Sequence, residues 1–539
     1  MIGRYRHFSL LSNAWLVAGA SLAALAVLGV LLWSPWDRPA IAGREPLLVY
    51  CAAGLRKPVA EIIADYRKEY GVQVQVTYDN SGNLLTAIRA RHDRPDAHVG
   101  DLYLANDVLN MRDAQTKYGV VAEAIPVALN RPVLVVNRRT QKTLQKQGKP
   151  VASVQDLLRS DLKVALASEA ASIGKLMRQL LEPSGIWARL EERRRKSNLV
   201  SDFTTVEQVA QTVSLQDGYV GVVWRATAVQ YEGLEIVTPP EFEGVTEQAM
   251  IGVLTRSRQP TAALQFARYL TARDKGLAIF QKYAFEPAAD ADFWEEVPEI
   301  HLAAGAMLKP GIEEVIKAFE RREGVKVNTS FNGCGLLVSQ MKGIKKGDAP
   351  GRFPDAYFAC DSSFLNDVQQ WFDAPVTVSQ NDVVFIVPKG NPKGVRPTLR
   401  ELTRPDLRIG LAHPTNSALG KLVDDLLLNL GLHAAVYGPD WQKRIVHTDA
   451  AHDLVNKMRA GALDLAVVYR SNALSTPGNV EKYLDILEPD IGLRATQPFA
   501  ISRESRHKQL VRRLLQAIVA HESAQRFKSL GFHWVYEGK

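Results

Sequence analysis

LLVYCAAGLRKPVAEIIADYRKEYGVQVQVTYDNSGNLLTAI, residues 47–88, has a second, similar copy further along the chain. The second copy is IHLAAGAMLKPGIEEVIKAFERREGVKVNTSFNGCGLLVSQM, residues 300–341, in which Gly324 stands where the first copy has Gly71. A repeat of this length predicts that one structural unit has been duplicated in tandem.

The similarity continues in the same order beyond these two stretches. The further pairs of matching blocks are 100–110 with 354–367, 164–181 with 409–427, 218–229 with 463–474, and 276–287 with 523–534. The length of 539 residues also exceeds what one hydrophobic core usually holds. We therefore predict two domains, 46–296 (unit 1) and 299–539 (unit 2), joined at the acidic, proline-containing segment FWEEVPE.

Short apolar runs alternate with helical patterns inside each unit. LLVY has the length and composition of a buried strand, and VQVQVTY alternates as a half-buried strand does. Between them, apolar residues recur at helical spacing from Val59 to Tyr66, Pro58 suits a first helical turn, and Gly71 is a typical helix stop. The order strand, helix, strand, helix predicts an α/β fold with helices on both faces of a sheet and binding loops at the carboxyl ends of the strands.

The loops that follow the predicted strands are rich in small residues, and several of them open onto a helix. In unit 1 they are AAGLRKP, DNSGNLL, LANDV, SEAASIGK, TTVEQV and VVWRATA. The first N–H groups of a helix lack partners within the helix, and the helix dipole favours negative charge there. One such loop is by itself an ordinary helix cap, but the recurrence of these loops in the same order in both units favours an anion site.

These loops also resemble the motifs of a known family. CAAGL after the first strand, NSGNL after the second, LYLANDV, VVWRATA and the ending FQKYAFEP are each similar to a motif of the periplasmic molybdate-binding proteins. Those are type II extracytoplasmic solute-binding proteins of oxyanion ABC importers. The resemblance implies that each unit has two α/β lobes, joined by crossover strands, that close like a hinge over a small oxyanion. It also implies an ABC transporter permease as a partner and no cofactor.

The resemblance places ligand-binding positions on both units. In unit 1 they are Gly54, where the family has a serine, Ser81, the backbone N–H groups of Ile173 and Val206, and Trp224, where the family has a tyrosine. In unit 2 they are Ala306, Cys334, Leu419, Ala451 and Tyr469. Backbone donors tolerate such substitutions, whereas hydroxyl donors do not. Because each hydroxyl bond to an anion contributes roughly 1.5–3 kcal/mol, we expect molybdate to bind less tightly in both units.

The cysteines of unit 2 allow three interpretations. Cys334 and Cys360 lie on neighbouring loops of the predicted sheet, and outside the cytoplasm two neighbouring thiols readily form a disulfide. A soft metal or redox-sensitive site is the second interpretation, since His413 and His452 lie on other loops of the same cleft. The third is a pair of free buried residues, as we expect for Cys51 in its strand.

The N-terminus has the pattern of a membrane anchor. Residues 14–33 are free of charge and long enough to cross about 30 Å of hydrocarbon. Basic residues before this span predict that residues 1–13 are cytoplasmic, that 34–45 is a linker, and that both binding domains are extracytoplasmic. The expected location is the bacterial inner membrane, with a single pass facing the periplasm. A cleavable signal remains the alternative, because AIA at 40–42 resembles a cleavage site.

Charge and motifs exclude several classes of function. The net charge of +8 is spread along the chain, and its densest basic cluster, at 191–198, has acidic neighbours typical of a solvated surface, so no nucleic-acid partner is expected. No nucleophile elbow, phosphate-binding Gly-Lys-Ser loop or zinc motif is present, so we expect neither an enzyme nor a metal protein.

The prediction is a membrane-anchored solute-binding protein that captures a molybdate-like or tungstate-like oxyanion for ABC-type import. The alternatives are an anchored sensor or scaffold with degenerate domains, and a thiol- or metal-binding variant of the fold.

Overall fold

The computed structural model describes residues 45–476, 478–489 and 492–538. The predicted cytoplasmic segment, the predicted span at 14–33 and nearly all of the predicted linker lie outside the described residues. None of the helices within the described part combines the length and the apolar character that a membrane crossing needs.

Unit 1 consists of two sheets, one in each lobe. The first-lobe sheet has the strand order β11-β4-β10-β3-β1-β2, and the second-lobe sheet has the order β7-β6-β8-β5-β9. Their bounds are β1 (Leu47–Ala52), β2 (Val74–Asp79), β3 (Leu102–Ala105), β4 (Val121–Asn130), β5 (Pro132–Asn137), β6 (Lys163–Ala167), β7 (Val200–Phe203), β8 (Tyr219–Trp224), β9 (Leu234–Val237), β10 (Glu247–Leu254) and β11 (Glu286–Pro287).

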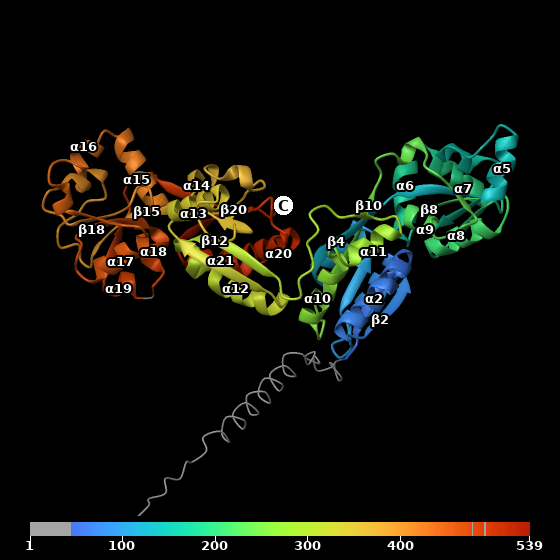
Figure 1. Cartoon of the computed structure of the whole chain (residues 1–539), viewed down its shortest axis with the longest axis horizontal. Helices are drawn as coiled ribbons and strands as arrows, with labels where there is room; N and C mark the ends of the chain where they lie inside the picture. Colours follow the sequence, from blue (N-terminus) through green and yellow to red (C-terminus); the bar gives the residue numbers. More distant parts are fainter. Residues whose placement is uncertain (1–44, 477, 490–491, 539) are drawn as a thin grey trace, which may run out of the picture.

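Helices cover both sheets of unit 1 (Figure 1). Those of the first lobe are α2 (Arg56–Tyr70), α3 (Ser81–His92), α4 (Val108–Arg112), α10 (Pro260–Thr271) and α11 (Gly276–Lys282). Those of the second lobe are α5 (Arg138–Lys146), α6 (Ser172–Leu181), α7 (Ile186–Lys196), α8 (Val206–Leu215) and α9 (Arg225–Ala228). Each lobe has its own hydrophobic core, so the cleft between the lobes lies between two separately packed bodies.

Unit 2 repeats this arrangement with the order β13-β12-β14-β20-β15-β18-β16-β17, and β19 and β21 pair with β15. Its strands are β12 (Glu299–Gly305), β13 (Lys326–Asn332), β14 (Ala356–Phe358), β15 (Val376–Pro388), β16 (Ile409–Ala412), β17 (Ile445–Thr448), β18 (Leu465–Tyr469), β19 (Leu484–Leu487), β20 (Arg494–Ile501) and β21 (Phe532–Trp534). Its helices are α12 (Lys309–Glu323), α13 (Cys334–Lys346), α14 (Ser362–Asn366), α15 (Ala418–Asn429), α16 (His433–Val436), α17 (Ala451–Arg459), α18 (Arg470–Leu474), α19 (Asn479–Lys482), α20 (Lys508–Ile518) and α21 (His521–Ser529).

The two units differ in how the chain first crosses between lobes. In unit 1 the crossing strands β4 and β5 are separate, with a break at Arg131. In unit 2 the single 13-residue strand β15 takes part in both sheets, pairing with β20 in one lobe and with β18 in the other. These strands are the crossover connections that a hinged two-lobed fold requires.

The glycine stops of the repeated stretch act as the sequence predicts. Helices α2 and α12 end at Gly71 and Gly324, whose φ angles are 69° and 66°. A left-handed residue of this kind suits glycine because it has no Cβ. On α2 the apolar residues Val59, Ile62 and Tyr66 are buried, which fixes the helix on its sheet.

A matched pair of buried aspartates shows the duplication at the level of single atoms. Asp101 accepts the backbone N–H of Leu48 over 2.9 Å and the hydroxyl of Ser257 over 2.6 Å. Asp355 accepts the backbone N–H of His301 over 2.9 Å and the hydroxyl of Ser505 over 2.8 Å. Both aspartates therefore tie strands and loops together in the first lobe of their unit.

The two units are joined through a buried ion triad. Glu323, 1% exposed, lies between Arg268 of unit 1 and Arg513 of unit 2. Its Oε2 accepts from Arg268 over 3.1 Å and its Oε1 from Arg513 over 2.6 Å. Although burial opposes ionisation, the two guanidinium groups hold the pKa of Glu323 below its usual value. The contact lies where α12 of unit 2 packs against both α10 of unit 1 and α20 of unit 2, near the middle of Figure 1.

Candidate functional site

A small cavity lies in the cleft of unit 1, where loops of both lobes meet. Its volume is about 20 Å³, which is roughly what one water molecule needs. It therefore suits a ligand of few atoms rather than a sugar or a peptide. The lining residues are Ala52, Ala53, Gly54, Asn80, Ser81, Asn106, Ala171, Ser172, Ile173, Thr205, Val206, Glu207 and Trp224. All five positions predicted for unit 1 are among them.

The start of α3 supplies the hydroxyl group of the cavity. Asn80 caps this helix by accepting the backbone N–H of Asn83 on its side-chain oxygen over 2.8 Å. The hydroxyl of Ser81, 2% exposed, accepts the backbone N–H of Asn106 over 3.1 Å. Because the hydroxyl accepts from the protein, its own hydrogen remains free to be donated to a ligand.

The second lobe contributes the starts of α6 and α8. Ile173 is the second residue of α6 and Val206 is the first residue of α8, and both side chains are buried. Thr205 and Gln208 form a capping box around the start of α8. The first backbone N–H groups of both helices have no partner within the helix and carry the positive end of its dipole. The arrangement can therefore stabilise a small anion without a charged side chain.

Contacts between the lobes close the cleft over this cavity. The backbone N–H of Gly82 donates to the carbonyl of Ala170 over 3.3 Å, and a Cβ at position 82 would lie 2.8 Å from that oxygen. Unit 2 has the same contact between Gly335 and Asn416, with an N–H to O distance of 3.1 Å. In both units a glycine thus allows the lobes to approach at the mouth of the cleft.

The two altered positions of unit 1 also lie on the cavity wall. Gly54 leaves space where the resemblance expects a serine, and a Cβ there would lie 3.4 Å from Cγ1 of Val206. Trp224, at the end of β8, is 1% exposed. Ser81 is therefore the one retained hydroxyl among the carried-over positions, as the sequence comparison expects.

Asn106 and Glu207 are polar residues of the cavity wall that the sequence did not single out. Asn106 is 3% exposed, and its Oδ1 is buried without a hydrogen-bond partner among the described residues. The same is true of Oε2 of Glu207. Burial raises the pKa of Glu207 despite the opposing effects of its own N–H, of Thr205 and of Arg56. Glu207 directly follows Val206, a predicted ligand position at a helix start. Its place in the first turn of that helix is the sequence feature that could have identified it.

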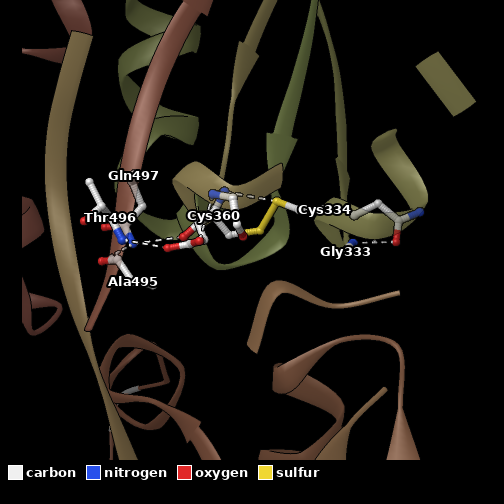
Figure 2. The surroundings of a disulfide bond; sticks show 9 residues. Gly333, Cys334, Cys360, Ala495, Thr496 and Gln497 are labelled. Carbon is white, nitrogen blue, oxygen red and sulfur yellow. Dashed lines mark hydrogen bonds between the residues drawn. A yellow bond between two sulfur atoms is a disulfide. The ribbon is translucent and has the colours of Figure 1, made fainter. Parts of the chain in front are cut away.

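In unit 2 the equivalent of the serine hydroxyl is part of a disulfide (Figure 2). The sulfurs of Cys334 and Cys360 are 2.02 Å apart, so the structure has the first of the three arrangements left open by the sequence. The carbonyl of Cys360 accepts from Nε2 of Gln497 over 3.1 Å, which ties this loop to β20. In the alignment Cys334 matches Ser81 and Cys360 matches Asn106. The bond therefore takes the place of the hydroxyl contact of unit 1.

A glycine in the opening loop of unit 2 makes room for this disulfide. A Cβ at Gly305 would lie 2.7 Å from Sγ of Cys360, closer than real contacts allow. The equivalent residue of unit 1 is Ala53. The disulfide of unit 2 is thus accompanied by a second substitution, glycine for alanine, in the loop that faces it.

The other predicted positions of unit 2 occupy the equivalent elements. Ala306 begins the short helix after β12, Leu419 is the second residue of α15, Ala451 begins α17, and Tyr469 ends β18. The hydroxyl of Tyr469 is buried and has no partner within the described ranges. Burial and then the charge of Asp361 raise the pKa of this hydroxyl well above its usual value, so it stays protonated and can donate.

Cys334 and Cys360 do not provide free thiol groups for a metal ion or a redox-sensitive ligand, because their sulfurs are bonded to each other. Cys51 is free and buried. Across the described parts of the chain, no three or more His, Cys, Asp and Glu side chains are grouped to hold a metal ion.

A larger groove, of about 380 Å³, lies between the two units along α12, α20 and α21. Four of its charged side chains form ion pairs with each other. Arg322 binds Glu123 with an Nε to Oε1 distance of 2.8 Å, and Arg513 binds Glu323. We therefore place the candidate ligand site in the cleft of unit 1 and assign this groove to the contact between the units.

Comparison with known proteins identifies the class. The family model for the bacterial extracellular solute-binding protein matches residues 47–286 and again residues 300–533. The chain therefore belongs to the bacterial extracellular solute-binding proteins and contains two tandem copies of the family domain, which confirms the predicted duplication.

Individual relatives cover about half of this chain each. A binding protein of Haemophilus influenzae is 27% identical over 243 residues, which are 45% of this chain and 91% of the relative. The molybdate-binding protein ModA of Mycobacterium tuberculosis is 26% identical over 244 residues, which are 44% of this chain and 85% of the relative. The ModA relative bears out the resemblance to molybdate-binding proteins, and both relatives are named as binding proteins.

Solved structures of binding proteins are similar as well. The periplasmic molybdate-binding protein of Azotobacter vinelandii is 15% identical with a TM-score of 0.36, covering 44% of this chain and 98% of its own. The sulfate-binding protein SubI of Mycobacterium tuberculosis is 20% identical with a TM-score of 0.36, covering 44% of this chain and 88% of its own.

Proposed function

We propose that this protein is a membrane-anchored, extracytoplasmic solute-binding protein whose unit 1 captures a small oxyanion for an ABC-type importer. One observation carries the proposal. The cavity of unit 1 has the size of a very small ligand and is lined by the starts of α3, α6 and α8 from both lobes. Helix starts that converge from opposite sides of a closing cleft stabilise an anion and couple its binding to closure. The named molybdate-binding and sulfate-binding relatives support a tetrahedral oxyanion as the ligand.

Titration calorimetry of the purified full chain tests this proposal. The ligands are molybdate, tungstate, sulfate and phosphate, each added separately. At least one should bind, and Ser81→Ala should weaken that binding because it removes the hydroxyl donor of the cavity. Tyr469→Phe, the matched removal of a buried hydroxyl in unit 2, should leave the affinity of unit 1 unchanged. An absence of binding heat with all four anions would contradict the proposal.

Membrane anchoring is a separate part of the proposal and rests on the uncharged segment 14–33. The full chain should sediment with the bacterial membranes and stay there after an alkaline wash. A variant that begins at residue 45 and is exported by a cleavable signal should be found in the soluble periplasmic fraction. Release of the full chain by the wash would argue for a processed signal instead.

A second candidate function applies to unit 2. Its disulfide occupies the place of the ligand hydroxyl, which favours a supporting or signalling role for this unit rather than a second capture site. In that case Tyr469→Phe should change neither the affinity nor the stoichiometry of anion binding. A second binding event that is lost in this variant would show that unit 2 also captures an anion.

A further inference from the structure

The cavity of unit 1 contains a carboxyl group in a place where an anion site would not be expected to have one. Glu207 is the one charged residue among those that line the cavity. Its Oε1 lies 3.7 Å from the position that a Cβ of residue 54 would occupy. Its Oε2 is buried and has no partner among the described residues. The carboxyl group thus reaches from the second lobe to the loop where the resemblance expects a serine hydroxyl.

The surroundings do little to neutralise this carboxyl group. Burial raises the pKa of Glu207, and its own N–H, Thr205 and Arg56 only partly oppose this effect. The guanidinium group of Arg56 lies over the ring of Tyr78, 4.3 Å from its centroid, and is not among the lining residues. The other titratable groups that interact with Glu207 are Tyr231 and Cys51, and the pKa of each is raised, chiefly by burial. Both are therefore neutral at neutral pH.

Asn106 adds a second polar group without a partner. It is 3% exposed, its Oδ1 is buried and unpaired within the described residues, and it lines the same cavity. A buried acceptor without a donor is costly. The two side chains are therefore suited to a ligand that offers a hydrogen as well as negative charge.

We propose that unit 1 selects an oxyanion that carries its own proton, such as hydrogen phosphate, and that Glu207 accepts the hydrogen bond from that proton. This inference rests on the proposed capture function and narrows its ligand class. A fully deprotonated anion has no hydrogen to donate, so no hydrogen bond offsets its repulsion from the buried carboxylate, and this weakens its binding strongly. Sulfate and molybdate can then bind only if Glu207 takes up a proton from solvent. Their affinity should therefore fall as the pH rises, whereas phosphate supplies its own proton.

Calorimetry of the full chain at pH 6 and pH 8 tests the proposal, with phosphate, sulfate and molybdate as the probes. Repeating each titration in two buffers that differ in ionisation enthalpy measures the protons taken up on binding. At pH 8 phosphate should bind at least about a hundredfold more tightly than sulfate or molybdate. All three are dianions at this pH, but hydrogen phosphate alone has a hydrogen to donate to Glu207, whereas the other two leave two unbridged negative charges in contact in a buried site. Any sulfate or molybdate binding should be accompanied by proton uptake.

Glu207→Gln is the matched variant, since it keeps the shape and adds an amide donor. It should reduce the preference for phosphate to tenfold or less and remove the proton uptake. Glu243→Gln, which alters an exposed glutamate of the same unit, should retain the preference of the unaltered chain. Equal affinity for phosphate and sulfate at pH 8 without proton uptake would overturn this inference and leave the capture function standing. No binding of any of these anions, nor of tungstate, would overturn both. Because proton uptake is measured on the unaltered chain, the test does not depend on folding of a variant.

Discussion

The cleft of unit 1 and the cleft of unit 2 have the same framework, and their chemistry differs most clearly at one matched pair of residues. Ser81 and Asn106 form a hydrogen bond in unit 1, and the corresponding Cys334 and Cys360 form a covalent bond in unit 2. The order of the strands in the sheets and the glycine contact between the lobes are retained. We infer that the helix starts define where an anion can bind, and that the side chains between them determine which ligand binds.

The largest expected effect concerns the contact that holds the two units together. Glu323 occupies the position that Tyr70 has in unit 1, and it pairs with Arg268 and Arg513 in a buried triad. Glu323→Ala should cost about 3–5 kcal/mol of unfolding free energy, because it leaves two buried guanidinium groups without an anion. Chemical denaturation of the full chain measures this.

The matched control for this change is Glu314→Ala, which breaks an exposed pair with Lys317 and should change the stability little. Equal effects of the two variants would show that the buried triad does not fix the units against each other. Separate unfolding transitions for the two units in Glu323→Ala alone would support its role as the joint.

The next largest effect is expected from removing the disulfide of unit 2. The double variant Cys334→Ala/Cys360→Ala opens a link between residues 26 apart and should destabilise unit 2 by about 2–4 kcal/mol, since the unfolded chain gains freedom. Thermal unfolding should show the loss in the transition of unit 2 only. The control is Cys51→Ala, which alters the one remaining cysteine and belongs to unit 1. Unchanged melting of the double variant would mean that the bond contributes nothing to the fold.

A smaller effect concerns ligand affinity in unit 1. Ser81→Ala removes a charge-assisted hydrogen bond worth roughly 1.5–3 kcal/mol, so the dissociation constant of the bound anion should rise by about 10- to 150-fold. Titration calorimetry measures the change. Ser184→Ala, a serine of the second lobe whose hydroxyl bonds only a backbone carbonyl, is the control. If both variants bind as tightly as the unaltered chain, the hydroxyl of Ser81 does not contact the ligand.

The smallest effect is a pH dependence of stability that distinguishes Glu207 from Glu323. Burial raises the pKa of Glu207 in the folded state above its value in the unfolded chain. When the pH rises above the unfolded-state pKa, the unfolded chain loses this proton more readily than the folded chain, so the folded state becomes less stable. Glu207→Gln should therefore raise the melting temperature by a few degrees at pH 8 and by less at pH 4. The folded-state pKa of Glu323 is lowered, so its contribution is present at neutral pH and lost on acidification. A stabilisation by Glu207→Gln that is larger at pH 4 would contradict this assignment.

The repeated stretch could be interpreted correctly from the sequence because its signals are local. Gly71 and Gly324 stop the two helices, and buried residues such as Val59 and Ile62 follow the helical period. Because of the duplication, each element predicted in one unit could be checked against the matching sequence of the other unit. The resemblance to the molybdate-binding proteins supplied the five predicted positions of unit 1, and all five line one cavity.

The roles of Glu207 and Gly305 could not be obtained in the same way, because both depend on distances between loops far apart in the chain. Glu207 looks like an ordinary acidic residue in a first helical turn, where the dipole favours it. Only the closed cleft shows that its Oε2 is buried without a partner. Gly305 is required by the sulfur of Cys360 across the loop, a contact that no local pattern reveals.

The number of anions bound per chain tests the central claim most directly. We predict one bound anion in calorimetry of the full chain, with binding strongly weakened in Ser81→Ala and retained at the same stoichiometry in Cys334→Ala/Cys360→Ala. Two anions per chain, or one anion whose binding depends on Tyr469 and not on Ser81, would contradict it.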